Sequence, residues 1–169
     1  MPALLTPGDL PVAERPVLLR ADLNVPLEEG KVADDFRIRA SLPAIEGLRE
    51  AGAVVVLCSH LGRPKGPEPS LRMDPVAERL AALAGWAVRK LDAVVGPEVA
   101  AGVAEAAPGD VLMLENTRFE SGETRNDPQL VEALAALAQY FVLDAFGSAH
   151  RAHASTVGVA QLLPSAAGS

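Results

Sequence analysis

Short apolar runs alternate along the chain with longer segments in which apolar residues recur at helical spacing. Five such runs occur, at residues 17–19, 54–58, 86–91 (the weakest), 111–114 and 140–143. Each run is continuous rather than alternating, which is typical of strands covered on both faces, and its shortness favours strand over helix. The pattern predicts an α/β domain built on a mostly parallel sheet.

Helical patterns separate these strands, and two of them start with an aspartate followed by a proline. Aspartate can cap the free N–H groups of a helix start, and proline is accommodated at the first helical position. Gly85 supplies a stop for one helix, and Pro43 either kinks another or begins its main part. The expected helices begin at Asp74-Pro75, at Asp127-Pro128, after Asp34-Asp35 and, more weakly, near Gly96.

Polar residues follow four of the five expected strands. In a parallel sheet all strands end at the same edge, and ligands of open α/β sheets bind in the crevice outside that edge. The sequence therefore predicts one site built from segments that are far apart in the chain. These segments are residues 20–26, 59–66, 115–119 and 144–153.

The net charge of the chain bears on what the arginines in these segments could bind. The 169 residues contain 15 Lys and Arg against 22 Asp and Glu, a net charge of −7. Such an acidic chain lacks the broad basic face that nucleic-acid binding needs, so no nucleic-acid partner is expected. Arginines that face one crevice repel one another unless a multiply charged anion lies between them.

The residue types in these segments suit a small phosphorylated hydroxy acid. Arginine donates paired hydrogen bonds to phosphate or carboxylate and keeps its charge. His60 could donate to a phosphate oxygen or a hydroxyl, and Asp22 and Asn24 offer partners for ligand hydroxyls. The plainer interpretation is that arginines and aspartates after strands pair with one another, and for Arg20, on the strand beside Asp22, this structural role is favoured.

Rival chemistries have weaker support. The sequence contains no GxxxxGK[ST] and no GxGxxG, which disfavours a P-loop or a dinucleotide fingerprint. The single cysteine, Cys58, excludes an intrachain disulfide and a Cys-built zinc site, and a buried structural role is favoured over a nucleophile. His150 and His153 lack a third metal ligand. No apolar stretch approaches the roughly 20 residues of a membrane span, and the first ten residues lack signal-peptide features, so we expect a cytoplasmic protein with no membrane partner.

Five long motifs make the sequence recognisable. They are RADLNVP at 20–26, SHLGRPKG at 59–66, GPEV at 96–99, LENTRF at 114–119 and DAFGSAHRAHAS at 144–155. With these motifs the chain resembles the N-terminal domain of phosphoglycerate kinases along nearly its whole length. The resemblance implies a Rossmann-like three-layer α/β/α fold for residues 1–169 as a single substrate-binding domain, in a family that is usually monomeric.

The resemblance also implies a reaction and a set of site residues. The family transfers a phosphoryl group reversibly between 1,3-bisphosphoglycerate and ADP, giving 3-phosphoglycerate and ATP in glycolysis. Arg37 matches the family's catalytic arginine, and Arg39 would point elsewhere on its helix. Leu143 and Thr117 depart from the family pattern at positions that are not ligand contacts. The implied substrate-binding residues are Asp22, Leu23, Asn24, Arg37, His60, Leu61, Gly62, Arg63, Arg118 and Arg151.

The same resemblance suggests that the chain is truncated before the C-terminal nucleotide-binding domain. Mg-ATP or Mg-ADP contacts belong to that domain in the family, so no metal and no nucleotide is expected on these residues. We expect the 169 residues alone to bind 3-phosphoglycerate or 1,3-bisphosphoglycerate without catalysing transfer. A sixth strand is expected to be missing, which would leave a sheet edge open. The alternative is a stand-alone α/β domain that binds phosphate or carboxylate without catalysis.

Overall fold

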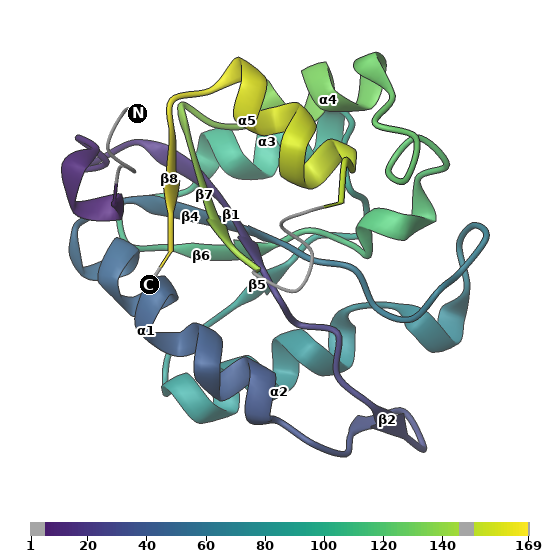
Figure 1. Cartoon of the computed structure of the whole chain (residues 1–169). Helices are drawn as coiled ribbons and strands as arrows, with labels where there is room; N and C mark the ends of the chain where they lie inside the picture. The colour runs from purple at the N-terminus through teal and green to yellow at the C-terminus, as the bar shows by residue number, and fades with distance from the viewer. Residues whose placement is uncertain (1–5, 146–150, 169) are drawn as a thin grey trace.

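A six-stranded parallel sheet forms the centre of the molecule in a computed structural model that describes residues 6–145 and 151–168 (Figure 1). Its strand order is β5-β6-β4-β1-β7-β8, and every neighbouring pair is parallel. A separate antiparallel pair joins β2 (Leu27–Glu28) to β3 (Lys31–Val32). The strands of the large sheet are β1 (Pro16–Ala21), β4 (Val54–Cys58), β5 (Arg89–Lys90), β6 (Val111–Met113), β7 (Tyr140–Asp144) and β8 (Ser165–Ala167).

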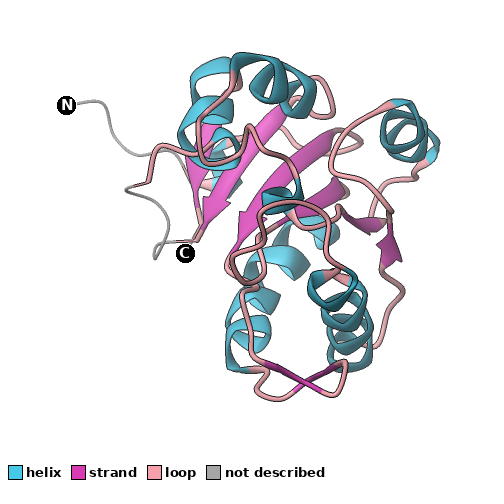
Figure 2. Cartoon of the chain, turned by 90° about the vertical axis from the view of Figure 1, so that its right-hand side faces the viewer, coloured by secondary structure: helices cyan, strands magenta, loops and turns pink. Residues whose placement is uncertain are grey.

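Helices cover both faces of this sheet, as Figure 2 shows. Single-turn elements lie in the connections: η1 (Pro7–Asp9), η2 (Pro69–Leu71), η3 (Thr117–Phe119) and the π-turn η5 (Ala154–Gly158). None of the helices in the described ranges is long and apolar enough to cross a membrane. The α-helices are α1 (Phe36–Glu50), α2 (Asp74–Ala84), α3 (Pro97–Glu105), α4 (Pro128–Ala135) and α5 (Val159–Leu162).

Alternate residues of β1 point into two separate cores. Val17 and Leu19 pack on the side of α1 and α2, with Ile38, Ile45, Val76 and Leu80. Leu18 packs on the other side, against residues of α3 and α4 such as Val103 and Leu134. Because both faces are buried, the strand carries no polar alternation, which is why its apolar run is continuous. The predicted three-layer α/β/α arrangement is confirmed.

The predicted helix starts are confirmed in position, and one of the two expected aspartate caps is absent. Asp127 caps α4, because its side chain accepts a hydrogen bond from the backbone N–H of Leu130 at 3.3 Å. Asp74 instead lies inside the first turn of α2, and its carboxylate pairs with Arg72 at 2.9 Å. Gly85 ends α2 with a φ of 80°, a conformation that favours glycine. α1 runs without a break through Pro43.

The expectation of a missing sixth strand is wrong. Residues Ser165–Ala167 form β8, which pairs with β7 so that Val142 lies opposite Ala166. This strand gives little signal in the sequence, because serine and alanine do not make an apolar run. β7 is therefore paired on both sides, and the short strand β8 forms this edge of the sheet. The run at residues 86–91 is also shorter than expected, since β5 contains only Arg89–Lys90.

Candidate functional site

One crevice at the carboxyl edge of the sheet collects most of the residues singled out from the sequence. Its volume is about 280 Å³. The segments after β1, β4 and β7 contribute side chains, as do the first turn of α1 and the short η3 helix after β6. The crevice is lined by Asp22, Asn24, Arg37, His60, Gly62, Arg63, Arg118 and Arg151.

Leu23 and Leu61 belong to the same segments, but their side chains do not line the crevice. Both are buried, with exposed fractions of 0% and 1%. The backbone N–H of Leu23 donates to Ser59 Oγ at 3.0 Å, and that of Leu61 donates to Asn116 Oδ1 at 3.2 Å. The buried leucine side chains anchor the two loops in the core. Any contact of Leu23 or Leu61 with a ligand is therefore limited to their backbone atoms.

Arg37 is held against the loop that follows β1. Its Nη1 donates to the carbonyl oxygen of Asn24 at 2.7 Å and lies 3.5 Å from Asp22 Oδ1. The Arg37 side chain remains 50% exposed, so most of its donors are free to meet a ligand. Arg39, two residues further on, pairs instead with Asp35 at 2.9 Å, as its different direction on the helix predicts.

Asn116 is a supporting residue that motif analysis alone does not assign. Its side chain is completely buried, and Oδ1 accepts from the backbone N–H groups of Leu61 and Arg118 at 3.2 and 3.1 Å. Its Nδ2 donates to the carbonyl oxygens of Leu61 and Leu71 at 2.8 and 3.0 Å. One amide thereby fixes both the loop after β4 and the start of η3, which carries Arg118.

Glu123 is a second support that the sequence does not indicate. It is fully buried, and its carboxylate accepts hydrogen bonds from the backbone N–H of Ser155 at 2.8 Å and from Ser155 Oγ at 2.6 Å. The backbone N–H of Ala154 donates to the carbonyl oxygen of Glu123 at 2.9 Å. This contact attaches the segment that begins at Arg151 to the loop between η3 and α4.

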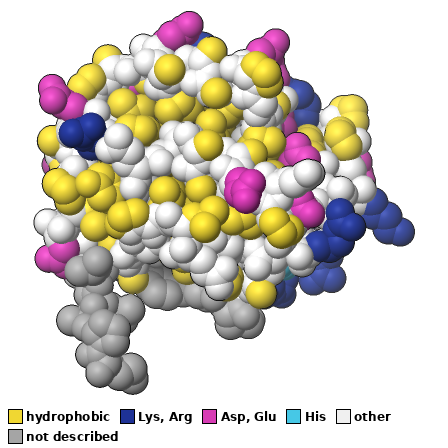
Figure 3. Space-filling view, turned by 90° about the horizontal axis from the view of Figure 1, so that it is seen from above, with side chains coloured by type: hydrophobic (Ala, Val, Ile, Leu, Met, Phe, Trp, Pro, Cys, Tyr) yellow, Lys and Arg dark blue, Asp and Glu magenta, His cyan; other side chains and the backbone are white. Residues whose placement is uncertain are grey.

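The crevice carries an excess of positive charge. Among its lining residues, four are arginines and Asp22 is the single carboxylate. Burial lowers the pKa of Arg118, and the neighbouring charges of Arg151 and Arg20 lower it further. This mutual repulsion is unfavourable until an anion enters. In Figure 3, most of the Lys and Arg side chains visible from the side of α4 and α5 gather at one rim, while the rest of that face is mainly apolar or uncharged.

Cys58 and the histidines do not form a second chemical centre among the described residues. Cys58 is a buried free thiol, and burial raises its pKa to about 12, so it holds its proton and is a poor nucleophile. His150 lies outside the described residues. Within residues 6–145 and 151–168, no group of three or more His, Cys, Asp and Glu side chains is arranged to hold a metal ion.

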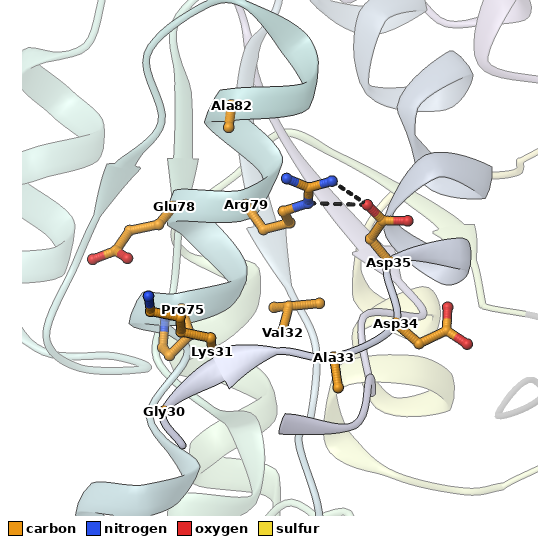
Figure 4. Close-up of a pocket in the computed structure, with 10 residues that line it drawn as sticks. All are labelled: Gly30, Lys31, Val32, Ala33, Asp34, Asp35, Pro75, Glu78, Arg79 and Ala82. Carbon is orange, nitrogen blue, oxygen red and sulfur yellow. Dashed lines mark hydrogen bonds and ion pairs between the residues drawn. The ribbon is translucent and has the colours of Figure 1, made fainter. Parts of the chain in front are cut away.

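A larger hollow of about 600 Å³ lies between the β2–β3 hairpin and α2 (Figure 4). Its most prominent contact is an ion pair in which Nε and Nη2 of Arg79 bind Asp35 Oδ2 at 2.9 and 2.6 Å. The remaining charges are one positive, on Lys31, and two negative, on Asp34 and Glu78. Unlike the arginine crevice, this hollow has no excess of positive charge, and its ion pair ties the start of α1 to α2.

The fold and the crevice together define a Rossmann-like α/β protein with an arginine-lined crevice at the carboxyl edge of its sheet. A family model described as phosphoglycerate kinase matches residues 8–169. The chain therefore belongs to the phosphoglycerate kinase family.

Individual relatives agree with this assignment. The chain is 56% identical over 167 residues to a phosphoglycerate kinase of Moorella thermoacetica and 56% identical over 164 residues to one of Thermomicrobium roseum. These matches cover 98% and 96% of the chain and 42% of each relative. The chain thus spans less than half the length of the curated relatives that it matches.

Solved structures give the same result. The phosphoglycerate kinase of Pyrococcus horikoshii OT3 aligns with a TM-score of 0.90 at 34% identity, covering 98% of this chain and 42% of that protein. The phosphoglycerate kinase of Coxiella burnetii aligns with a TM-score of 0.86 at 36% identity, covering 98% and 41%. The Rossmann-like fold expected from the sequence is confirmed.

Proposed function

We propose that the arginine crevice is the 3-phosphoglycerate or 1,3-bisphosphoglycerate site of a phosphoglycerate kinase. The enzyme would transfer a phosphoryl group reversibly between 1,3-bisphosphoglycerate and ADP, giving 3-phosphoglycerate and ATP. One observation carries the proposal: four arginines from separate segments line a single crevice in a chain of net charge −7. Family membership supports the same assignment.

The proposed roles follow from the chemistry of each side chain. The guanidinium groups of Arg63, Arg118 and Arg151 would hold the phosphate and carboxylate of the substrate, because arginine matches both anions with paired hydrogen bonds. Asp22 and Asn24, which are partly exposed in the crevice, would bind the substrate hydroxyl. Residues 1–169 would then act as one substrate-binding domain.

Arg37 is proposed as the catalytic arginine. Phosphoryl transfer depends mainly on positioning and on neutralising the charge of the equatorial oxygens. Arg37 suits this role because one of its nitrogens is held by Asn24 while half of the side chain stays exposed. Its exposed donors could reach a phosphoryl group at the mouth of the crevice.

Mg-ATP or Mg-ADP would be the second substrate, bound by residues other than those described. The described residues offer no cluster of metal ligands, and the sequence contains neither phosphate-binding glycine motif. We therefore assign no step to magnesium on these residues, and we expect the 169 residues assayed alone to show no turnover. The enzyme would be monomeric, as is usual in the family, and cytoplasmic, where the single free cysteine suits a reducing compartment.

Calorimetric titration of the 169-residue chain with 3-phosphoglycerate tests the binding role. We expect saturable binding that weakens as salt is added, because the attraction is electrostatic. Glycerate and inorganic phosphate, which each carry only part of the substrate's charge, should bind more weakly. Absence of 3-phosphoglycerate binding at low salt would reject the assignment. Equal affinity for inorganic phosphate would support the alternative, a stand-alone domain that binds anions without catalysis. No separate observation favours that alternative.

A further inference from the structure

A buried arginine contacts the histidine of the crevice. Arg20 on β1 is 1% exposed, and its Nη2 lies 2.7 Å from Nδ1 of His60. No carboxylate of the described residues lies within ion-pair distance of Arg20. Its Nε and Nη1 are buried without a hydrogen-bond partner in the described part of the chain. Among the described residues, the contact with His60 is therefore the principal polar interaction of this guanidinium group.

The chemistry of the two groups determines which of them donates. A guanidinium group has only N–H donors and does not lose its proton in proteins. Nδ1 of His60 must then accept with its lone pair, since two N–H groups pointing at each other across 2.7 Å would repel. A neutral imidazole carries one proton, and with Nδ1 as the acceptor that proton resides on Nε2. The ring lines the crevice, so its remaining nitrogen is the one available to a ligand.

We propose that Arg20 is a positioning residue that fixes His60 as the neutral tautomer with its proton on Nε2, so that His60 offers the crevice an uncharged hydrogen-bond donor. The identity of the anion that receives this hydrogen bond rests on the proposed function, whereas the tautomer does not. An uncharged donor suits this position because a further positive charge would add to the repulsion among the arginines.

The surroundings of His60 favour the neutral state from several directions. Burial lowers the pKa of His60 to about 3, with further lowering by the charges of Arg20 and Arg118. His153 and Arg151, in the segment after β7, act in the same direction. Asp22 is the one carboxylate that lines the crevice with His60. The other charged groups of the crevice are Arg37 and Arg63.

Nuclear magnetic resonance of the ¹⁵N-histidine-labelled chain tests the tautomer directly. The chain has three histidines, and the spectrum of His60→Gln identifies the signals of His60. Long-range ¹H–¹⁵N correlations should show a protonated Nε2 and an unprotonated Nδ1, unchanged from pH 5.5 to pH 8. A proton on Nδ1, or a doubly protonated ring at pH 7, would overturn the proposal.

Two substitutions separate the action of Arg20 from a purely structural role. Arg20→Met keeps an unbranched side chain but removes the donor, so His60 should populate both neutral tautomers, while burial and the remaining positive charges still keep the ring neutral. Arg20→Lys keeps a charged donor and should restore the tautomer protonated at Nε2. If His60 in a folded Arg20→Met chain keeps the wild-type tautomer, Arg20 does not position it. The wild-type spectrum remains decisive even if Arg20→Met fails to fold.

A binding measurement links the tautomer to the site. The affinity for 3-phosphoglycerate is compared among wild type, Arg20→Met and Arg20→Lys at the same pH and salt concentration. Arg20→Met should bind more weakly, because only part of its His60 population carries the proton on Nε2, and Arg20→Lys should recover the affinity. Equal affinity of wild type and Arg20→Met would contradict the link. If wild type shows the expected tautomer but does not bind 3-phosphoglycerate, the proposed function fails while the assignment of Arg20 stands.

Discussion

The side-chain oxygen of Asn24 accepts a hydrogen bond from the backbone N–H of Gly62 at 2.9 Å. Asn24 follows β1 and Gly62 follows β4, so this contact joins the loops of two neighbouring strands at the floor of the crevice. Gly62 has a φ of 63°, and a Cβ there would lie 3.0 Å from Leu71 Cδ2. The loop thus depends on a glycine and on a specific amide partner.

Asn24→Ala should therefore loosen the crevice. The backbone N–H of Gly62 would lose its acceptor, which lowers the free energy of unfolding by about 1 kcal/mol, and 3-phosphoglycerate binding should weaken by about tenfold. Urea unfolding and calorimetric titration measure the two effects. Gln139→Ala serves as the control, because this exposed amide lies just before the amino end of β7, at the edge of the sheet opposite the crevice. Wild-type affinity in Asn24→Ala would show that the joined loops do not matter for binding.

Arg63→Ala and Arg151→Ala test the anion site itself. Each change should weaken 3-phosphoglycerate binding by roughly 1.5–3 kcal/mol, because a charge-assisted hydrogen-bonded pair is lost. Stability should stay constant or rise slightly, since repulsion among the arginines is relieved. Arg125→Ala removes another exposed arginine, one whose Nε binds the carbonyl oxygen of Ser121, and should leave affinity unchanged. Equal binding by all three variants would mean that the anion binds elsewhere.

His60 gives the stability of the chain a pH dependence of defined sign. Burial and Arg20 lower its pKa to about 3, whereas an unfolded histidine titrates near 6.5. Between these values the unfolded chain binds more protons, so the free energy of unfolding falls as the pH drops below about 6.5. The loss due to His60 should reach about 2 kcal/mol at pH 5.

Other groups also titrate between pH 4 and pH 7. The contribution of His60 is therefore obtained by comparing the pH dependence of unfolding in wild type and in a variant without His60. Burial raises the pKa of Asp144 to about 6; its contribution therefore declines as the pH rises from about 4 to 6, opposite to that of His60. Burial lowers the pKa of His153, which acts in the same direction as His60. Urea unfolding of wild type and His60→Gln at pH 7 and pH 5 isolates His60. Parallel losses in the two chains would contradict the prediction.

Glu123→Ala should detach the segment that begins at Arg151. The buried carboxylate accepts two hydrogen bonds from Ser155, and its removal leaves their donors unsatisfied, at a cost of about 2–4 kcal/mol in unfolding free energy. The rate at which a thiol reagent modifies the buried Cys58 reports local opening, since the chain has one cysteine.

Ser155→Ala provides the graded comparison for this prediction. It removes one of the two hydrogen bonds to Glu123 and keeps the backbone contact, so its loss of stability should be smaller and its Cys58 should react more slowly than in Glu123→Ala. If both variants protect Cys58 as well as wild type does, the buried carboxylate does not hold the segment in place.

The parts of the fold that the sequence predicts are those in which burial dictates residue type. The strand at residues 54–58 carries an unbroken apolar run because both of its faces are covered. β8 and the β2–β3 hairpin were not predicted, because each depends on backbone pairing at two or three residues with no distinctive composition.

The residues of the site also fall into those that the sequence predicts and those that it does not. The ends of parallel strands meet at one edge, so the convergence of Arg63, Arg118 and Arg151 could be inferred from chain order alone. Arg37 comes from a helix start, and only the family resemblance pointed to it. Asn116 and Glu123 act through partners that are distant in sequence, and no local pattern identifies such partners.

The strand order also determines when each strand can pair with its neighbours during translation. β1 lies between β4 and β7, with Val17 opposite both Val55 and Tyr140. A ribosome releases β1 and β4 early, yet one side of β1 has no backbone partner until the residues of β7 emerge. During that interval the nascent chain exposes an apolar strand with unpaired N–H and C=O groups, the kind of segment that chaperones shield from aggregation.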